Sequence, residues 1–248
     1  SLGDNNIYKG FIGVLAKQGS VSNLTIGAGS DLQFTGYAGA FVGYCYGKVI
    51  NCKNYAKITN YTSTTGGIVG SSLAGSEIRD CFNAGEVLGG TTNVGGIVGT
   101  AVGVIENCQN VGWVETKKLS TRAPGRIVGG IAGSANGTTI TNVVNAGHVQ
   151  SAVESAGGIV GQQISGENQI SGAVNYGTVF SVKGTKTGAI AGDYKTNGKV
   201  ENVYFDAQST GLKAAANDGS LKMSSVKTAD FTSGKTLKGL SADVWQFD

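Results

Sequence analysis

One short block recurs along this 248-residue chain at intervals of about 30 residues. It consists of a glycine, a small or apolar residue, two apolar residues and a closing glycine. A fixed period of this kind is the signature of a repeat architecture, in which each unit packs mainly against its neighbours. The chain is therefore predicted to be a stack of similar units. The copies stand at 39–43, 66–70, 95–99, 129–133, 157–161 and 188–192, with a shorter version at 10–13.

A second block follows the first and has a constant length. In each of five copies, the last residue number is nine higher than the first. The distance from the end of a copy to the next glycine block varies instead, with differences in residue number of 8, 8, 15, 8 and 9. Blocks of constant length with variable connectors are typical of stacked rungs joined by surface loops. These copies occupy residues 49–58, 78–87, 105–114, 140–149 and 170–179.

The residue pattern predicts strands and excludes several other classes. Side-chain character alternates within the second block, as in a β-strand. The 42 glycines would destabilise helices, and a single proline excludes collagen. A net charge of +3 is too small to indicate a nucleic-acid partner, and no apolar stretch is long enough to span a membrane. We predict an all-β, right-handed parallel β-helix, or β-solenoid, of about seven ~30-residue rungs.

Stacking places equivalent residues of successive rungs in columns, so the environment of a whole column can be predicted at once. One inward column is expected to fill the core, and a second is expected to form a ladder of hydrogen-bonded asparagines. Because three of the four cysteines fall in the first column, we expect free, buried thiols that bind no metal. The first column contains Leu24, Cys52, Cys81, Cys108, Val143, Ala173 and Val203, and the second contains Asn54, Asn83, Asn110, Asn145 and Asn175.

The last 44 residues break the pattern. They lack the glycine block and are richer in Lys, Ser and Thr. Because an open end of a β-stack invites aggregation, it is usually covered. We therefore divide the chain into a repeat region, 1–204, and a capping segment, 205–248, in which Trp245 seals the last rung.

The two blocks together resemble the GLUG-motif repeat family. The tetrapeptide Gly-Ile-Val-Gly at 67–70, 96–99 and 158–161 and the Asn-Cys-x-Asn-x-Gly-x-Val block carry the resemblance, which covers roughly residues 38 to 204. It implies a secreted or cell-surface bacterial protein, similar to adhesins. Such repeats also accompany IgA-specific metallopeptidases. That activity requires a His-Glu-x-x-His zinc site, and this chain has one histidine, so the resemblance does not extend to it.

The sequence contains few candidate catalytic groups. A carbohydrate-active β-helix enzyme is the main alternative, but it would need clustered carboxylates on adjacent rungs. Instead, Arg79 beside Glu106 resembles a surface ion pair between rungs, and His148 lies alone at an outward position. No catalytic residue, metal or cofactor is predicted.

Two features are candidates for binding. Glu86, Trp113 and His148 form an outward column in which the tryptophan is unusual, and exposed aromatic residues often mark recognition sites. The long connector nearby carries Lys117, Lys118 and Arg122, which could attract an anionic glycan. We predict a non-catalytic, extracellular binding module for a host glycan or matrix ligand. The second alternative is a structural stalk without a ligand. Five tyrosines, at positions 37, 44, 46, 55 and 61, also gather near the first rungs.

Overall fold

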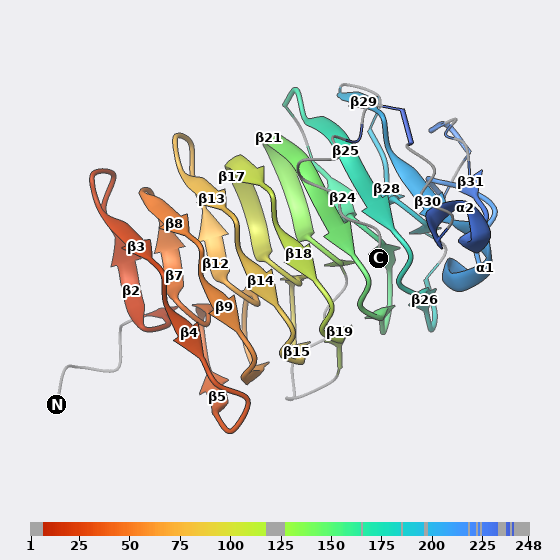
Figure 1. Ribbon diagram of the computed structural model, residues 1–248. Helices are drawn as coiled ribbons and strands as arrows, with labels where there is room; N and C mark the ends of the chain where they lie inside the picture. Colours follow the sequence, from red (N-terminus) through yellow and green to blue (C-terminus); the bar gives the residue numbers. More distant parts are fainter. Residues whose placement is uncertain are drawn as a thin grey trace, which may run out of the picture.

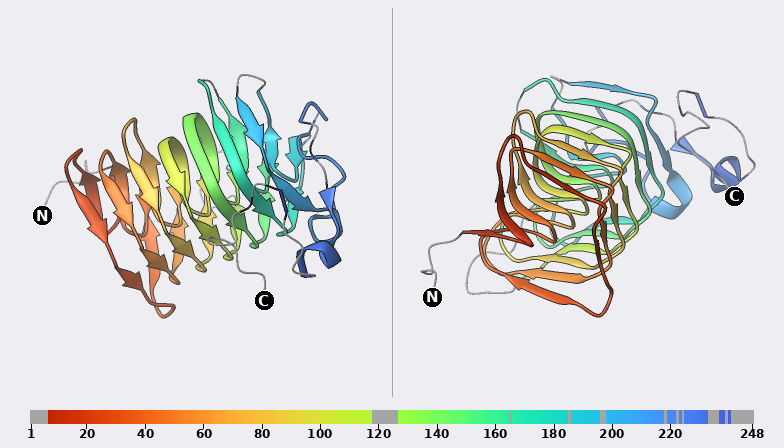
Figure 2. Two further views of the ribbon diagram at one scale, coloured as in Figure 1. Left: turned by 45° about the horizontal axis from the view of Figure 1, so that its top comes forward. Right: turned by 60° about the vertical axis from the view of Figure 1, so that its left-hand side comes forward.

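The chain coils into a parallel β-solenoid. The computed structural model describes residues 7–117, 127–164, 166–184, 186–195, 198–217, 219–221, 223, 225–232, 237–238 and 240. Successive coils stack side by side along one axis, so that the order along the rod follows the order along the sequence (Figure 1). Seen toward the end of the rod, the coils superpose around a common interior (Figure 2). The predicted β-solenoid is confirmed.

Two sheets each take one short strand from every coil. The first comprises β1 (Tyr8–Lys9), β6 (Tyr37–Gly39), β11 (Thr65–Gly66), β16 (Asn93–Gly95), β20 (Ile127–Gly129), β23 (Ser155–Gly157) and β27 (Lys186–Gly188). The second comprises β5 (Asp31–Phe34), β10 (Lys57–Asn60), β15 (Val87–Gly89), β19 (Val114–Thr116), β22 (Val149–Ser151) and β26 (Val179–Ser181). Seven strands in one sheet and six in the other correspond to about six full turns.

The third sheet forms the longest side of each coil and contains 18 strands. In the first three coils these are β2 (Ile12–Leu15), β3 (Ser20–Ser22), β4 (Thr25–Ile26), β7 (Val42–Cys45), β8 (Lys48–Ile50), β9 (Lys53–Asn54), β12 (Val69–Ser72), β13 (Glu77–Arg79) and β14 (Phe82–Asn83). The later ones are β17 (Val98–Glu106), β18 (Gln109–Asn110), β21 (Ala132–Asn145), β24 (Val160–Gln163), β25 (Gln169–Asn175), β28 (Ala191–Asp193), β29 (Lys199–Glu201), β30 (Tyr204–Asp206) and β31 (Ser225–Val226).

The strands pair in parallel and in the register of the sequence repeat. Ile78, for example, lies between Val49 of the preceding coil and Ile105 of the following one. Because each coil repeats the same inward positions, like side chains stack into a continuous apolar core. The inward cysteine column is buried as predicted, from Cys52 to Val203. Leu24 departs from the prediction and is 37% exposed, because it lies in the first coil, which has a pairing partner on one side only.

Buried asparagines join the coils through their side chains. Each amide nitrogen donates to the side-chain oxygen of the asparagine in the next coil at 2.8 Å. The last member, Asn175, donates to the carbonyl of Ala189, also at 2.8 Å. Each amide additionally donates to a backbone carbonyl two residues ahead, as Asn110 does to Gly112 at 3.1 Å. The predicted ladder is confirmed, and its amide groups are hydrogen-bonded although fully buried.

A second polar column adopts a backbone conformation that the sequence analysis did not predict. Its residues have φ between 50° and 60°, in the left-handed region that favours Gly, Asn and Asp. The side chain of Asn51 also donates to that of Asn23 at 2.8 Å. This column turns the chain at one corner of every coil. It contains Asn23, Asn51, Asp80, Asn107, Asn142, Gly172 and Asn202.

The C-terminal segment packs against the last coil. The backbone amides of Ala189, Ile190 and Ala191 donate to carbonyls of Ala214 and Ala215, as they would to a further coil. Ala215, Ala216 and Leu221 belong to the main apolar core. Strand β30 runs across the predicted boundary at 204, and Trp245 lies outside the described residues. The described helices, α1 (Ala207–Thr210) and α2 (Thr228–Thr232), are too short to cross a membrane.

We predict that Asn110→Ala lowers the free energy of unfolding by about 3 kcal/mol. The substitution leaves the Asn83 amide and the Asn145 oxygen each without one partner, and an unsatisfied buried polar group costs about 1–3 kcal/mol. Urea denaturation followed by circular dichroism measures the loss. Gln109→Ala, an outward residue of the same strand, is the control and should cost less than about 0.5 kcal/mol. Equal losses in the two variants would contradict a stabilising role for the ladder.

Candidate functional site

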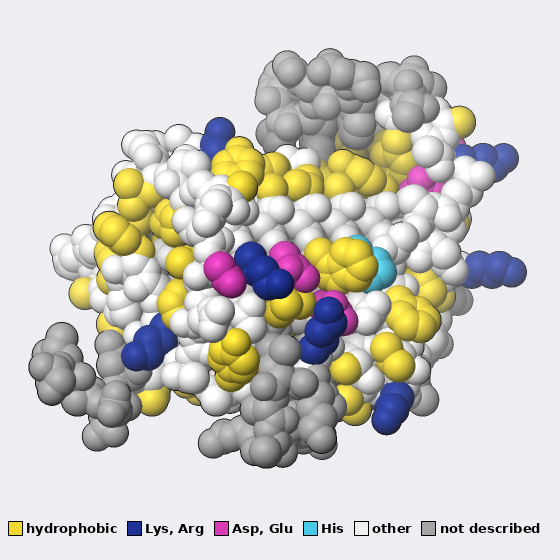
Figure 3. All heavy atoms as spheres, turned by 90° about the horizontal axis from the view of Figure 1, so that it is seen from below, with side chains coloured by type: hydrophobic (Ala, Val, Ile, Leu, Met, Phe, Trp, Pro, Cys, Tyr) yellow, Lys and Arg dark blue, Asp and Glu magenta, His cyan; other side chains and the backbone are white. Residues whose placement is uncertain are grey.

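The alternation of side chains along the strands predicts a column of outward residues that contains Trp113. In the structure this column forms a row across five coils. The neighbouring inward residues pair in register, which places Lys57, Glu86, Trp113, His148 and Thr178 side by side. In Figure 3, charged side chains, a hydrophobic side chain and the single histidine follow one another in a line on this face. The row lies along the second sheet, on strands β10 to β26 and the residues just before them.

Trp113 is the most exposed large residue of this row, at 47%. Its ring centroid lies 4.2 Å from that of His148 in the next coil, with the planes inclined by 53°. On the other side, Glu86 forms an ion pair with Lys57 at 3.0 Å. The carboxylate of Glu86 raises the pKa of the Lys57 amine by accepting its hydrogen bond. Trp113 and His148 therefore form one aromatic surface, and Glu86 belongs to a separate ion pair beside it.

A chain of polar contacts runs behind this aromatic surface. Nδ1 of His148 contacts the Thr178 hydroxyl, and its Nε2 lies 3.3 Å from the side-chain oxygen of Gln150. The Gln150 amide donates to Glu115 at 2.9 Å, and the other oxygen of Glu115 pairs with the Lys117 amine at 2.9 Å. These five residues come from three successive coils and hold the histidine ring in place.

Some of these residues were predicted and others were missed. Lys117 is half exposed and lies beside the site, whereas Lys118 and Arg122 lie outside the described residues. Glu115 and Gln150 were missed. They stand two residues after Trp113 and His148, so the same strand alternation places them on the same face. The periodicity could therefore have identified both.

A second aromatic cluster lies on the first two coils. Tyr8 and Tyr37 pair in register, and the ring of Tyr44 lies 4.5 Å from Tyr8, 5.9 Å from Tyr37 and 5.5 Å from Tyr46 between centroids. Partial burial, followed by the neighbouring hydroxyl groups, raises the pKa of Tyr44. Tyr8 and Tyr37 are 29 residues apart, one repeat, and this spacing was the signal that could have identified the cluster.

A shallow cavity also opens on the early coils. It has a volume of about 270 Å³ and is lined by Lys9, Gln33, Phe34, Thr35 and Tyr61. None of the predicted site residues that the structure describes lines it. The Trp113 site is therefore an exposed surface of the rod, separate from this cavity.

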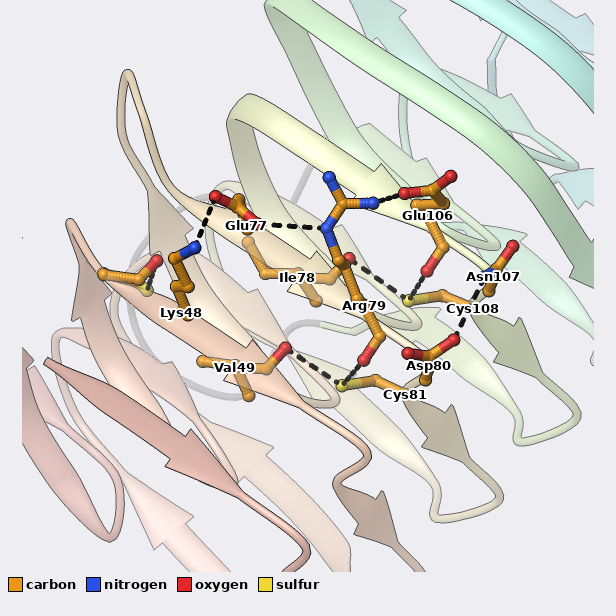
Figure 4. A network of polar contacts seen from close by, with 12 residues as sticks. Lys48, Val49, Glu77, Ile78, Arg79, Asp80, Cys81, Glu106, Asn107 and Cys108 are labelled. Carbon is orange, nitrogen blue, oxygen red and sulfur yellow. Dashed lines mark hydrogen bonds and ion pairs between the residues drawn. The ribbon is translucent and has the colours of Figure 1, made fainter.

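Charged residues of the long sheet form ion pairs both within a coil and between coils. Figure 4 shows Lys48 and Arg79 on either side of Glu77, with Arg79 reaching on to Glu106. The predicted pair between Arg79 and Glu106 is confirmed. Among the described residues, no group of three or more His, Cys, Asp or Glu side chains could hold a metal ion.

The four cysteines are buried and free, as predicted. The thiols of Cys81 and Cys108 donate to backbone carbonyls within the core, including those of Arg79 and Glu106 (Figure 4). Burial raises the pKa of the Cys45 thiol to about 11. The Cys81 pKa is also raised, chiefly by its hydrogen bond with Cys108. The Cys45 and Cys81 thiols therefore stay protonated at neutral pH and act as small apolar side chains.

The comparisons with known proteins support the fold. No protein-family model and no curated protein matches this chain. A similar solved structure is that of a "putative immunoglobulin A1 protease" from Bacteroides ovatus, with a TM-score of 0.62 and 24% sequence identity. The match covers 86% of this chain and 65% of the other, so the chain spans less than two thirds of that protein. At this identity the likeness shows a shared solenoid fold.

The thiols give a prediction for alkaline pH. The folded-state pKa of Cys45 lies above the ordinary thiol value, so its contribution to stability is fully present below about pH 8.5 and is lost as pH rises toward 11. We expect each such thiol to reduce the free energy of unfolding by about 1.4 kcal/mol per pH unit in this window. Urea denaturation from pH 8 to 11 measures the slope, which should be shallower in Cys45→Ala. An equal slope in both proteins would contradict the assignment.

Proposed function

We propose that this chain is an extracellular bacterial binding module without catalytic activity, and that its ligand is a glycan held at the Trp113 face. In this proposal the solenoid serves as a rigid rod that displays a recognition surface. Host-cell or matrix glycans would be the ligands, as in an adhesin. The resemblance of the repeats to the GLUG-motif family supports the extracellular setting.

The observation that carries this proposal is the exposure of Trp113. Most large apolar residues of the repeat point inward and are fully buried, whereas Trp113 projects from the outer face and remains 47% exposed. Leaving an indole in water forgoes the stabilisation that its burial would give. A tryptophan beside a fixed histidine and an amide presents a flat apolar surface with polar groups at its edge. Sugars have the same combination of an apolar ring face and peripheral hydroxyl groups.

The strand register gives the site a rigid base. Val114 and Val149, which directly follow the two aromatic residues, are fully buried and paired with each other. The backbone amide of Val114 also donates to the carbonyl of His148 at 2.8 Å. The site therefore needs little ordering when a ligand binds, which favours affinity.

We predict that Trp113→Ala reduces glycan binding about tenfold or more, which corresponds to about 1.4 kcal/mol of lost stacking and burial. A glycan array followed by titration calorimetry on the best ligand measures the change. Because Trp113 points outward, the variant should keep the circular dichroism spectrum of the unmodified protein.

The control is Phe11→Ala, which removes a 72% exposed aromatic side chain from the first coil and should bind normally. Binding that Trp113→Ala leaves unchanged would move the site elsewhere on the rod. If the unmodified protein retained no glycan, the stalk interpretation would be the better account.

A further inference from the structure

Lys57 and Lys117, which flank Trp113 in the described part of the chain, are each paired with a carboxylate. The Lys117 amine pairs with Glu115 at 2.9 Å, and the Lys57 amine pairs with Glu86 at 3.0 Å. Each pair places one cation against one carboxylate, so neither contributes net charge to the surface. The sequence analysis treated Lys117, Lys118 and Arg122 of the long connector as a group that could attract an anionic glycan, and of these three Lys117 lies among the described residues.

Glu115 fixes Lys117 more firmly than a surface ion pair would. Its side chain is only 4% exposed, although it projects from the outer face of the sheet. One carboxylate oxygen accepts from Gln150 and the other pairs with Lys117. Removing the partner of a buried carboxylate is costly, because the charge left behind is neither solvated nor compensated. An anionic ligand that drew Lys117 away would incur this cost.

His148 makes its polar contacts within the protein. Its Nε2 lies 3.3 Å from the side-chain oxygen of Gln150, whose own amide donates to Glu115, and its Nδ1 contacts the Thr178 hydroxyl. In the part of the chain that the structure describes, the polar groups beside the aromatic surface are therefore paired with one another, and Lys57 and Lys117 each have a carboxylate partner.

We propose that the Trp113 site selects uncharged glycans over sialylated or sulfated ones. The apolar face of a neutral sugar would stack on the indole. Its hydroxyl groups would accept the ammonium hydrogens of Lys117 that Glu115 does not use, since an ammonium has three donors. This inference rests on the proposed function and specifies its ligand class.

The test compares matched neutral and acidic forms of the same glycans at about 0.1 M and about 1 M NaCl, where the Debye length falls from about 10 Å to about 3 Å. We expect neutral forms to bind more tightly and their affinity to change less than about twofold with salt. A preference for the acidic forms that weakens about tenfold at high salt would overturn the proposal. Such a preference would instead indicate the charges of Lys118 and Arg122 in the long connector.

The variant Glu115→Gln tests the mechanism of selection. It keeps the shape and the acceptor for Gln150 but removes the negative charge that holds Lys117. We expect acidic glycans to gain about fivefold in affinity, or about 1 kcal/mol, because a cation is released. Glu167→Gln removes an exposed carboxylate elsewhere and should change nothing. A Glu115→Gln variant that folds normally and still rejects acidic glycans would overturn the role of Glu115.

Failure of this inference is distinguishable from failure of the proposed function. Salt-sensitive binding of acidic glycans that still depends on Trp113 would overturn the selectivity and leave a glycan-binding module. If neither form bound at either salt concentration, both proposals would be overturned together.

Discussion

The hydrogen bond from one buried asparagine amide to the next is the interaction on which the register of the coils depends. Each amide has to meet a partner at 2.8 Å in the coil beside it, and every side chain of the ladder is fully buried. A shift by one residue would place an apolar side chain or bare backbone opposite the amide and would bury an unsatisfied group. Apolar contacts tolerate such shifts more readily, because they are not directional. The ladder therefore specifies the alignment that the apolar core then stabilises.

The outer face is free of this constraint, and there the coils differ from one another. At the position of Trp113 the other coils carry Lys57, Glu86, His148 and Thr178, which share no chemistry. The residue types at inward positions repeat because each side chain packs against the equivalent side chain of the next coil. Outward side chains face the solvent instead. The solenoid thus places the residues that stabilise the stack on its inner face and the residues that differ between coils on its outer face.

The sequence was sufficient to predict whatever depends on periodicity. The constant nine-step block fixed the stacking, and with it the asparagine ladder, the buried thiols and the contact between Arg79 and Glu106. Features that depend on the path of the backbone were not predicted. The left-handed corner at Asn51 and its equivalents arises where the coil turns, and alternation carries no information about turning. Likewise, Ala214 and Ala215 continue the hydrogen bonding of the last coil without any glycine block to reveal it. At the candidate site, Trp113 and His148 were predicted. The alternation could also have placed Glu115 on the same face, but not its burial, because the burial of an outward residue depends on its surroundings.

In the proposed function, the aromatic surface of Trp113 and His148 would also determine how many ligands one rod can hold. Its polar support comes from three neighbouring coils, and among the described residues no other coil repeats the combination of side chains. Although the fold is a tandem array, the proposed Trp113 site would therefore hold one ligand per chain. Any avidity at this site would have to arise from many copies of the chain displayed on one surface, where a second binding event benefits from the high local concentration created by the first. The number and spacing of the displayed rods would then determine the strength of attachment. The affinity of each site would determine how fast a single rod dissociates.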